Sequence, residues 1–446
     1  MIAGYRCASC GATVDIAEPF PFRCPNATGT DRRHLLRIVS SIAPMRPTDD
    51  PNPYVAFGPF LAWQAFAAAH GMRPDACDAL ARELGFAIQA EWGATPRWTP
   101  FGRADALSDA LGFAADGGVW VKDETGNVSG SHKARHLVST MLQLRAAEEL
   151  GIVPWSRRSD RPPLAIASCG NAALAAAQVA YASDGWPLEV FVPTSAIGRV
   201  VASLGELEAD VVVCPRRRGD PPGDPCVHRF LEAVAGGAIP FSVQGTENAL
   251  CLDSGRTIGW ELALQFDRDP RTTRPIDRMF VQVGGGALAT CAWAGVHEQG
   301  TVARLHAVQT EGCAPLARAW ERARSIGFAD APARWTESMW PWEPVEDSAA
   351  TGILDDETYD WVGVVDAMAA SGGQPVVVSE RLILEANTLA TAHTDIPVDP
   401  TGSAGLAGVL ARRGWSGDAG SVGTDNGADL IRRNENVVVV FSGRCR

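Results

Sequence analysis

Lysine is nearly absent from this chain of 446 residues. Of its 39 lysine and arginine residues only two are lysines, Lys122 and Lys133, which leaves 37 arginines. Arginine keeps its proton inside proteins, whereas a desolvated lysine can become a neutral amine that attacks carbonyl groups. A lysine retained in such a chain is therefore a candidate for chemistry that a guanidinium group cannot perform.

The chain also lacks an excess of positive charge and any long apolar run. Its net charge of −13 argues against binding to a nucleic-acid backbone. No stretch approaches the roughly 20 apolar residues that span a bilayer, and the first residues lack the apolar segment of a signal peptide. The eleven cysteines are odd in number and mostly single, which indicates reduced thiols in a cytoplasmic protein. We expect no nucleic-acid partner and no membrane association.

Three cysteines form a group near the N-terminus. Cys7 and Cys10 have the spacing C-x-x-C, and thirteen residues separate Cys10 from Cys24. A structural zinc site needs four thiolate or imidazole ligands, and His34 is the best candidate for the fourth. We predict a small zinc-ribbon-like segment over residues 1–40. The alternative is a set of unrelated thiols that contains one redox-prone pair.

Apolar strand-like runs alternate with helical patterns over most of the chain. This alternation indicates βαβ units around a mainly parallel sheet, which is an α/β fold. Expected strands cover 118–122, 164–167, 188–192, 210–214, 239–243, 279–283, 305–309, 375–378 and 437–441. Helical patterns cover 58–70, 75–84, 171–183, 254–266, 287–299 and 401–412.

The two lysines differ in their sequence context. Lys133 ends a small-residue loop that starts at Ser129 and runs into an amphipathic helical pattern over residues 134–150. Lys122 lies at the end of the apolar run 118–122, where we expect it to cap a strand. We therefore interpret Lys133 as the residue that anchors a cofactor covalently.

Two expected strands end in unusual loops, and ligands bind at the carboxyl ends of parallel strands. The first loop consists of Ser168, Cys169, Gly170 and Asn171 and precedes an alanine-rich helix. Free amides at that helix start can hold a carboxylate, and the Asn171 side chain can donate a hydrogen bond to a ligand. The alternative is a helix cap with a tight turn.

The second loop follows the strand 279–283. It is made of Gly284, Gly285, Gly286, Ala287 and Leu288. Glycines let the backbone wrap a phosphate that the start of a helix stabilises. The same glycines fit a dinucleotide fingerprint, and an acidic residue ends the following strand. An NAD(P)-dependent oxidoreductase is therefore an alternative function, although it leaves the scarcity of lysine unexplained.

These loops together resemble the fold-type II pyridoxal-phosphate enzymes, the tryptophan synthase β-subunit-like superfamily. They are most similar to threonine synthases and to serine/threonine dehydratases, over roughly residues 95–446. The order and spacing of the motifs make the resemblance specific. The motifs are Glu124-x-x-Asn127-x-Ser129-Gly130-Ser131-His132-Lys133, Ser168-x-Gly170-Asn171, Gly284-Gly285-Gly286 and Ser442-Gly443-Arg444.

The resemblance implies a two-domain fold with parallel sheets flanked by helices. The large domain that binds pyridoxal phosphate would comprise residues 41–137 and 246–446, and the small substrate-binding domain would comprise residues 138–245. Relatives with this architecture are often dimers, so a homodimer is expected.

The resemblance also implies residue roles. Lys133 would hold pyridoxal phosphate as a Schiff base, and Ser131 could shuttle a proton beside it. His132 could contact the phosphate, and a structural role for it is the alternative. The loop of Ser168, Cys169, Gly170 and Asn171 would hold the substrate carboxylate, and Asn171 would also contact the phenolic oxygen of the cofactor. Ser442 would lie beside the pyridine nitrogen.

A hydroxyl group at the pyridine nitrogen predicts the reaction class. It cannot stabilise a pyridinium as a carboxylate would, so the ring is a weaker electron sink and expulsion of a β or γ substituent is favoured. We predict an amino-acid lyase or synthase that performs elimination, deamination or replacement. Departures from the family pattern at Ala134, Cys169 and Ala287 leave the substrate open. A zinc-ribbon protein with a non-catalytic barrel that binds a partner is a third interpretation.

Overall fold

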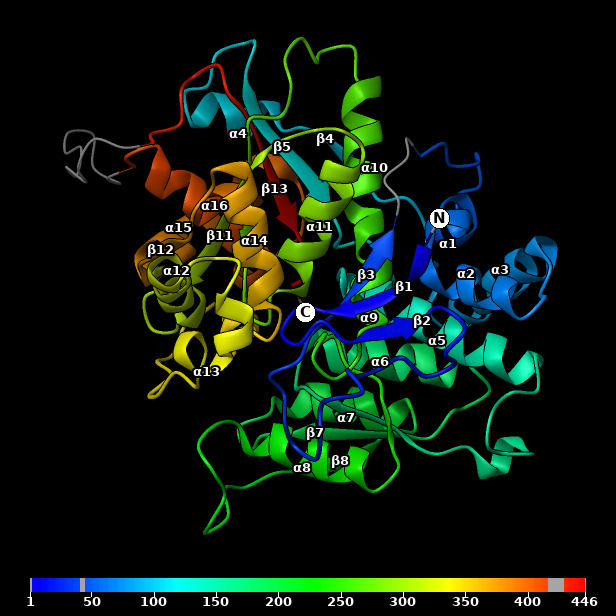
Figure 1. Ribbon diagram of the computed structural model, residues 1–446. Coiled ribbons are helices and arrows are strands. Elements are labelled where there is room, and N and C mark those ends of the chain that lie inside the picture. The colour runs from blue at the N-terminus through cyan, green and yellow to red at the C-terminus, as the bar shows by residue number, and fades with distance from the viewer. Residues whose placement is uncertain (1, 41–44, 416–428, 446) are drawn as a thin grey trace. The chain divides into compact units, whose positions relative to one another are not determined.

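The computed structural model describes residues 2–40, 45–415 and 429–445. The chain divides into two compact units. Figure 1 labels their helices and strands. Unit 1 consists of Met1–Trp98, Asn127–Thr257 and Pro332–Thr336, and unit 2 consists of Thr99–Gly126, Ile258–Ala331 and Glu337–Arg446. Each of the three sheets lies within a single unit.

Unit 1 begins with a small antiparallel sheet of strand order β2-β1-β3. Its strands are β1 (Ile2–Cys7), β2 (Thr13–Asp15) and β3 (Leu36–Ser40). The sequence predicts none of the three, because none is a continuous apolar run and their apolar residues do not alternate regularly. The helices α1 (Pro53–Ala56), α2 (Ala62–Ala69) and α3 (Pro74–Trp92) follow. Helix α3 starts with a proline and stops at Gly93 in the left-handed conformation, a common start and stop for a helix.

The second sheet of unit 1 is entirely parallel and has the order β8-β7-β6-β9. Its strands are β6 (Leu164–Ala167), β7 (Leu188–Val192), β8 (Asp210–Val213) and β9 (Ile239–Pro240). The helices that join them are α6 (Asn171–Tyr181), α7 (Gly198–Glu206) and α8 (Pro225–Ala235). The predicted bounds of β6 and β7 are confirmed residue for residue.

Helix α5 (Lys133–Glu149) of unit 1 is buried around most of its circumference. The prediction that it is amphipathic is wrong, because its polar residues are buried as well as its apolar ones. Arg135, His136, Thr140 and Gln143 are each at most 2% exposed. Other parts of unit 1 cover them, among them the short helix α9 (Cys251–Ser254).

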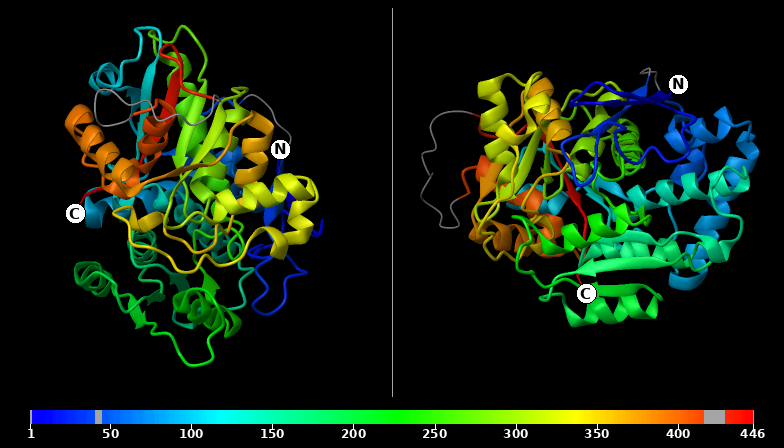
Figure 2. Two further views of the ribbon diagram at one scale, coloured as in Figure 1. Left: turned by 90° about the vertical axis from the view of Figure 1, so that its left-hand side faces the viewer. Right: turned by 60° about the horizontal axis from the view of Figure 1, so that its bottom comes forward.

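Unit 2 is built on a six-stranded sheet of order β12-β11-β10-β13-β5-β4. Only the edge strand β4 is antiparallel to its neighbour. The last strand of the chain, β13, is drawn in red in Figure 2 and lies between β5 and β10. The strands are β4 (Phe101–Arg103), β5 (Gly118–Asp123), β10 (Arg278–Gln282), β11 (Arg304–Thr310), β12 (Val376–Val378) and β13 (Asn436–Phe441).

Helices cover this sheet, and every residue of β13 is buried. Helix α16 (Pro400–Arg412) packs on β10, β11 and β13, and its Leu406 and Val409 belong to the same core cluster as Val437 and Val439 of β13. Strands of a parallel sheet covered on both faces form continuous apolar runs, which is why the sequence predicts them well. The helices of unit 2 are α4 (Asp105–Ala110), α11 (Ala287–Glu298), α12 (Pro315–Ile326), α14 (Trp361–Ser371), α15 (Glu380–Thr394) and α16 (Pro400–Arg412).

Two further helices, α10 (Arg256–Arg268) and α13 (Trp335–Ser338), contain residues of both units. Among the described residues, no helix combines the length and the apolar character that crossing a bilayer requires.

Candidate active site

Lys122 lies in a closed polar site of unit 2. Its amine contacts three acceptors: Glu261 Oε2 at 2.7 Å, Gln265 Oε1 at 2.9 Å and the Thr99 carbonyl oxygen at 2.9 Å. The side chains of Lys122 and Glu261 are both 0% exposed. An ammonium group has three protons to donate, so these partners satisfy it completely. The lysine is part of the core of unit 2, in the next-to-last position of β5, and it holds no position open for a ligand.

Lys133 has different surroundings in unit 1. It is the first residue of α5 and is only partly buried. The preceding loop is tightly turned, since Ser129 and Gly130 have φ values of 57° and 68°. The Ser131 hydroxyl lies 3.4 Å from the Ser129 hydroxyl and accepts a hydrogen bond from the Lys133 amide at 3.3 Å. Ser131 therefore holds the start of the helix and fixes where the Lys133 side chain begins.

His132 precedes this lysine and is buried. Burial lowers the pKa of His132 well below its usual value, and the positive charges of Lys133 and Arg135 and the neighbouring His136 add to the effect. The ring of His132 packs edge-on against that of His136 at a centroid distance of 5.6 Å. These effects favour the neutral form of the His132 imidazole, which can donate or accept a hydrogen bond.

The loop from Ser168 to Asn171 also lies in unit 1, after β6. The Ser168 hydroxyl accepts a hydrogen bond from the Gly170 amide at 3.4 Å, and Asn171 is the first residue of α6. A side chain at Gly170 would meet no atom within 4 Å, so this turn faces open space. Helix α6 packs against both α5 and the 3-10 turn η2 (Val128–Gly130) that precedes Lys133. The two motifs of unit 1 are thus brought together.

The glycine loop of unit 2 connects β10 to α11. Gly286 caps the helix in the left-handed conformation, with a φ of 99°. A Cβ atom at Gly284 would overlap the carboxylate of Asp355, and one at Gly285 would lie 3.1 Å from the ring of Tyr359. The loop is therefore a close-packed strand-to-helix turn in which side chains would displace Asp355 and Tyr359, and the first amides of α11 have no partners within the helix. This arrangement fits a phosphate group.

Asp355 and Tyr359 are residues beside this loop that the sequence does not reveal. They belong to the segment between the 3-10 turn η5 (Thr351–Ile353) and α14, where the Asp360 amide donates to the Gly285 carbonyl oxygen at 2.8 Å. The segment has neither a repeating apolar pattern nor a motif, so no sequence signal identifies it.

Ser442 follows β13, the strand that pairs with β10. The carboxyl ends of these two parallel strands meet at one edge of the sheet, so Ser442 and the glycine loop share that edge. Ser442 is buried, and its amide donates to the Gly402 carbonyl oxygen at 3.3 Å. Gly443 then turns the chain with a φ of 117°. The hydroxyl is thus held by a rigid backbone.

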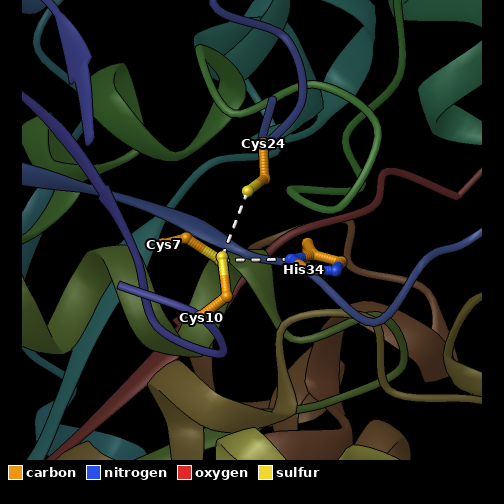
Figure 3. Close-up of side chains that lie close together, drawn as sticks. All are labelled: Cys7, Cys10, Cys24 and His34. Atoms are coloured by element: carbon orange, nitrogen blue, oxygen red, sulfur yellow. Dashed lines mark hydrogen bonds between the residues drawn. The ribbon is translucent and has the colours of Figure 1, made fainter. Parts of the chain in front are cut away.

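The predicted metal ligands gather in unit 1. The ligand atoms of Cys7, Cys10, Cys24 and His34 all lie within 4.8 Å of one another (Figure 3). The Cys10 and Cys24 sulfur atoms are 3.6 Å apart, and Cys7 Sγ lies 3.5 Å from His34 Nδ1. Two sulfur ligands of tetrahedral zinc are about 3.8 Å apart, given a Zn–S bond of about 2.3 Å. The four side chains thus have the chemistry and the spacing of a closed metal site.

Polar groups support these ligands. The Nε2 atom of His34 lies 3.5 Å from Asp31, so a carboxylate orients the imidazole whose Nδ1 atom faces the thiols. Burial opposes ionisation of Cys10, but hydrogen bonds from the Ala12 backbone, Asn26 and the neighbouring thiols lower the pKa of Cys10 to about 6. The group can therefore supply a thiolate near neutral pH.

Comparison with known proteins identifies the family. Residues 94–443 match the model of the family described as pyridoxal-phosphate dependent enzyme. A cysteate synthase from Methanoculleus marisnigri is 26% identical over 278 residues, which are 59% of this chain and 58% of that protein. A cysteate synthase from Methanosphaerula palustris is 26% identical over 329 residues, 69% of each. The chain thus spans less than two thirds of the length of the first of these relatives.

Solved structures share the fold. Threonine deaminase isoform 2 from Solanum lycopersicum has a TM-score of 0.56 and 19% identity, covering 83% of this chain and 85% of its own. Maize serine racemase has a TM-score of 0.55 and 17% identity, covering 82% and 93%. A fungal L-serine ammonia-lyase from Rhizomucor miehei has a TM-score of 0.55 and 18% identity, covering 78% and 94%.

These structures confirm the predicted α/β fold with parallel sheets flanked by helices. The N-terminal cysteine cluster is consistent with the predicted zinc-ribbon-like segment. Of the two cofactor interpretations that the glycine loop allows, the family match favours pyridoxal phosphate over a dinucleotide. Because the family model covers more than three quarters of its length, this chain belongs to the pyridoxal-phosphate dependent enzyme family.

Proposed function

We propose that the chain is an amino-acid lyase or synthase that removes or replaces a substituent at the β or γ carbon, with Lys133 as the covalent anchor of the cofactor. The assignment of Lys133 as the anchor rests on the contrast between the two lysines. Lys122 is buried and bound by three acceptors, whereas Lys133 starts a helix next to the Ser168–Asn171 loop.

The residues of the chain would divide the binding of pyridoxal phosphate among them. The amides of Gly284, Gly285, Gly286, Ala287 and Leu288 would hold the phosphate, and His132 would contribute a hydrogen bond to it. Ser442 would lie beside the pyridine nitrogen, and Asn171 would contact the phenolic oxygen. When bound, pyridoxal phosphate withdraws electrons from the α-carbon of an attached amino acid.

The chemical steps would use side chains of unit 1. The Lys133 amine, when free and uncharged, would accept the α-proton of the substrate at Nζ. The Ser131 hydroxyl would relay that proton from Nζ to the departing group. The amides and hydroxyl of Ser168, Cys169 and Gly170 hold the substrate carboxylate, with Asn171 beside it.

Two considerations support loss of a side-chain substituent. A serine hydroxyl at the pyridine nitrogen makes the ring a weaker electron sink than a carboxylate would, which favours expulsion of a leaving group. Both cysteate synthase relatives are named for a product that carries a sulfonate on its β-carbon, which replacement at that carbon would form. A racemase is the second candidate, since racemases share the fold.

One experiment tests the anchor. The purified protein incubated with pyridoxal phosphate is expected to be yellow, and reduction with borohydride should add the cofactor mass to the peptide that contains Lys133. Modification of Lys122 instead, or of neither lysine, would refute the proposal.

A second experiment tests the reaction class. Amino acids with β or γ leaving groups, including serine derivatives offered together with sulfite, are screened for absorbance changes and for released 2-oxo acid, ammonia or cysteate. Conversion of one enantiomer into the other without loss of a substituent would favour the racemase.

We further propose that Cys7, Cys10, Cys24 and His34 bind one structural zinc ion per chain. The spacing of their ligand atoms and the Asp31 carboxylate behind His34 support this proposal. Plasma mass spectrometry should find about one zinc per chain, and His34→Ala should lower that content. Equal zinc in the parent and the variant would exclude His34 as a ligand.

The remaining proposals rest on the family resemblance. We propose a homodimer in the cytoplasm, and a division of the chain into the zinc-ribbon-like segment 1–40, a large domain of residues 41–137 and 246–446, and a small domain of residues 138–245. Light scattering tests the dimer, and limited proteolysis tests the boundaries.

A further inference from the structure

Glu247 is a fully buried carboxylate in unit 1, in the segment between β9 and α9. Its charge partners are two arginines from the N-terminal segment. Arg23 Nε lies 3.4 Å from one carboxylate oxygen and Arg32 Nε lies 3.3 Å from the other. Burial raises the pKa of Glu247, while the charges of Arg32 and Arg23 oppose that rise. The carboxylate depends on the two arginines for its charge balance, because an unpaired buried charge is strongly destabilising.

Both arginines are attached to the metal-binding group. Arg23 directly precedes Cys24, and Arg32 stands two residues before His34. The Arg23 guanidinium also donates to the carbonyl oxygens of Gly29 at 3.0 Å and Asp31 at 2.6 Å, which closes the chain between these two ligands into a loop. The position of both arginines is therefore set by the same loop that carries two of the four ligands.

The N-terminal segment also contacts the body of unit 1 next to Glu247 and at α5. The Ala249 amide donates to the Phe22 carbonyl oxygen at 2.9 Å, beside Glu247. The Gln143 side chain, on α5, donates to the Pro19 carbonyl oxygen at 3.2 Å. The segment is thus attached both to the chain around Glu247 and to the helix that begins with Lys133.

The chain around Glu247 is itself attached to α5. The Asn248 side-chain amide donates to the Thr140 hydroxyl at 3.2 Å, and His136 Nδ1 lies 2.7 Å from the Cys251 carbonyl oxygen. Thr140 and His136 are on α5, and His136 lies one helical turn from Lys133. Together with the Pro19 contact, these hydrogen bonds account for the burial of His136, Thr140 and Gln143 on α5.

We propose that the metal centre positions helix α5, and with it Lys133, by holding the loop 23–34 against Glu247. The role of the lysine rests on the proposed function. The connection from the metal ligands through Glu247 to α5, which we call the clamp, does not. Without metal, the loop that carries the arginines is no longer closed by its ligands. The ion pairs of Arg23 and Arg32 with Glu247 then weaken, and so does the hydrogen bond from Gln143 to Pro19. The start of α5 therefore becomes more mobile.

The test uses the full chain and the variant Glu247→Gln, which keeps the shape of the side chain and removes its charge. The matched control is Glu435→Gln in unit 2, another buried carboxylate paired with an arginine, Arg278. The first readout is the rate of zinc release to a colour-forming chelator. We expect release from Glu247→Gln to be about tenfold faster than from the parent, and release from Glu435→Gln to be unchanged. Equal rates for all three proteins would overturn the proposal.

The second readout is hydrogen exchange before and after chelation of the metal. Peptides from α5 and from residues 247–251 should exchange faster without metal, while β10 and β13 in unit 2 should not change. Unaltered exchange in α5 would refute the clamp. Should Glu247→Gln fail to fold, Arg32→Gln removes one charge partner from a residue nearer the surface and gives the same comparison.

The third readout is the reactivity of Lys133 toward an amine reagent. The chain has two lysines and Lys122 is buried, so the reagent should label Lys133. The mass of the labelled peptide identifies the modified lysine. Its labelling rate should change when the metal is removed. A protein that holds no zinc would end the clamp proposal without affecting cofactor trapping on Lys133. Conversely, faster exchange in α5 combined with no cofactor on Lys133 would keep the clamp and refute the proposed function.

Discussion

The two lysines of this chain occupy opposite kinds of site. Lys122 is enclosed in unit 2 with three acceptors at hydrogen-bonding distance and an oppositely charged partner, Glu261. Lys133 is partly exposed at the start of a helix in unit 1, after a tightly turned loop of small residues. A closed charge pair stabilises a fold but cannot react. The comparison therefore makes Lys122 a structural residue and supports the proposal that Lys133 anchors the cofactor.

The six-stranded sheet of unit 2 shows the same contrast between its two edges. At the edge where β10 and β11 start, Arg278 and Arg304 pair with Asp429 and Glu435 at 2.6 to 3.4 Å. At the opposite edge, where β10 and β13 end, lie the glycine loop and Ser442. Charges are paired at one edge, and small residues leave backbone amides for a ligand at the other.

The largest expected effect comes from Lys133→Ala. Without an amine at this position no covalent bond to pyridoxal phosphate forms, so borohydride reduction should add no mass. Turnover of any accepted amino acid should fall roughly a thousandfold or more. If the variant still traps the cofactor, on Lys122 or elsewhere, the contrast between the lysines is wrong.

Lys122→Met should instead reduce stability. It leaves Glu261 as an uncompensated buried carboxylate, which costs about 3–5 kcal/mol of unfolding free energy. Urea unfolding measures the loss, and the molecules that remain folded should still trap the cofactor on Lys133. The double variant Lys122→Met/Glu261→Gln should recover part of the lost stability. Unfolding identical to that of the parent would show that the closed site does not stabilise unit 2.

A side chain in the glycine loop should weaken cofactor binding. Gly284→Ala would overlap the Asp355 carboxylate and crowd Ile353, which displaces the backbone that holds the phosphate. We expect an affinity for pyridoxal phosphate about a hundredfold lower, measured by absorbance titration. Gly205→Ala in α7 is the control, because its Cβ meets no atom within 4 Å. Equal affinities in both variants would show that the glycine loop does not hold the phosphate.

The smallest expected effect is the pH dependence of the stability that Asp429 contributes at the charged edge of the unit 2 sheet. Burial would raise the pKa of Asp429, but pairing with Arg278 and the charges of Arg304 and His306 lower it overall. The unfolded chain therefore binds this proton more readily than the folded one, and the stabilisation is present above about pH 4 and lost as pH falls further. Asp429→Asn should cost about 1 kcal/mol at pH 7. Chemical unfolding should show that this difference shrinks below pH 4, and a constant difference would argue against the pairing.

Prediction from sequence works best where strands are buried on both faces. The runs at 118–122, 279–283 and 437–441 predict β5, β10 and β13 to within one residue at each end. It fails for β1 to β4, since none of these strands is a continuous buried apolar run. It also fails for the exposure of α5, because a polar residue such as Thr140 looks solvent-facing until its contact with Asn248 is known.

The sequence by itself determined the family, the alternation of strands and helices, and the residues suited to hold a phosphate, a metal and a covalent cofactor. These features depend on residue type and local spacing. Only the tertiary structure decided that Lys122 is enclosed by Glu261 and Gln265, that Asp355 lies against the glycine loop, and that Arg23 and Arg32 meet at Glu247. Such pairings join residues far apart in the chain, and the free energy of burying their charges together depends on packing that no local pattern records.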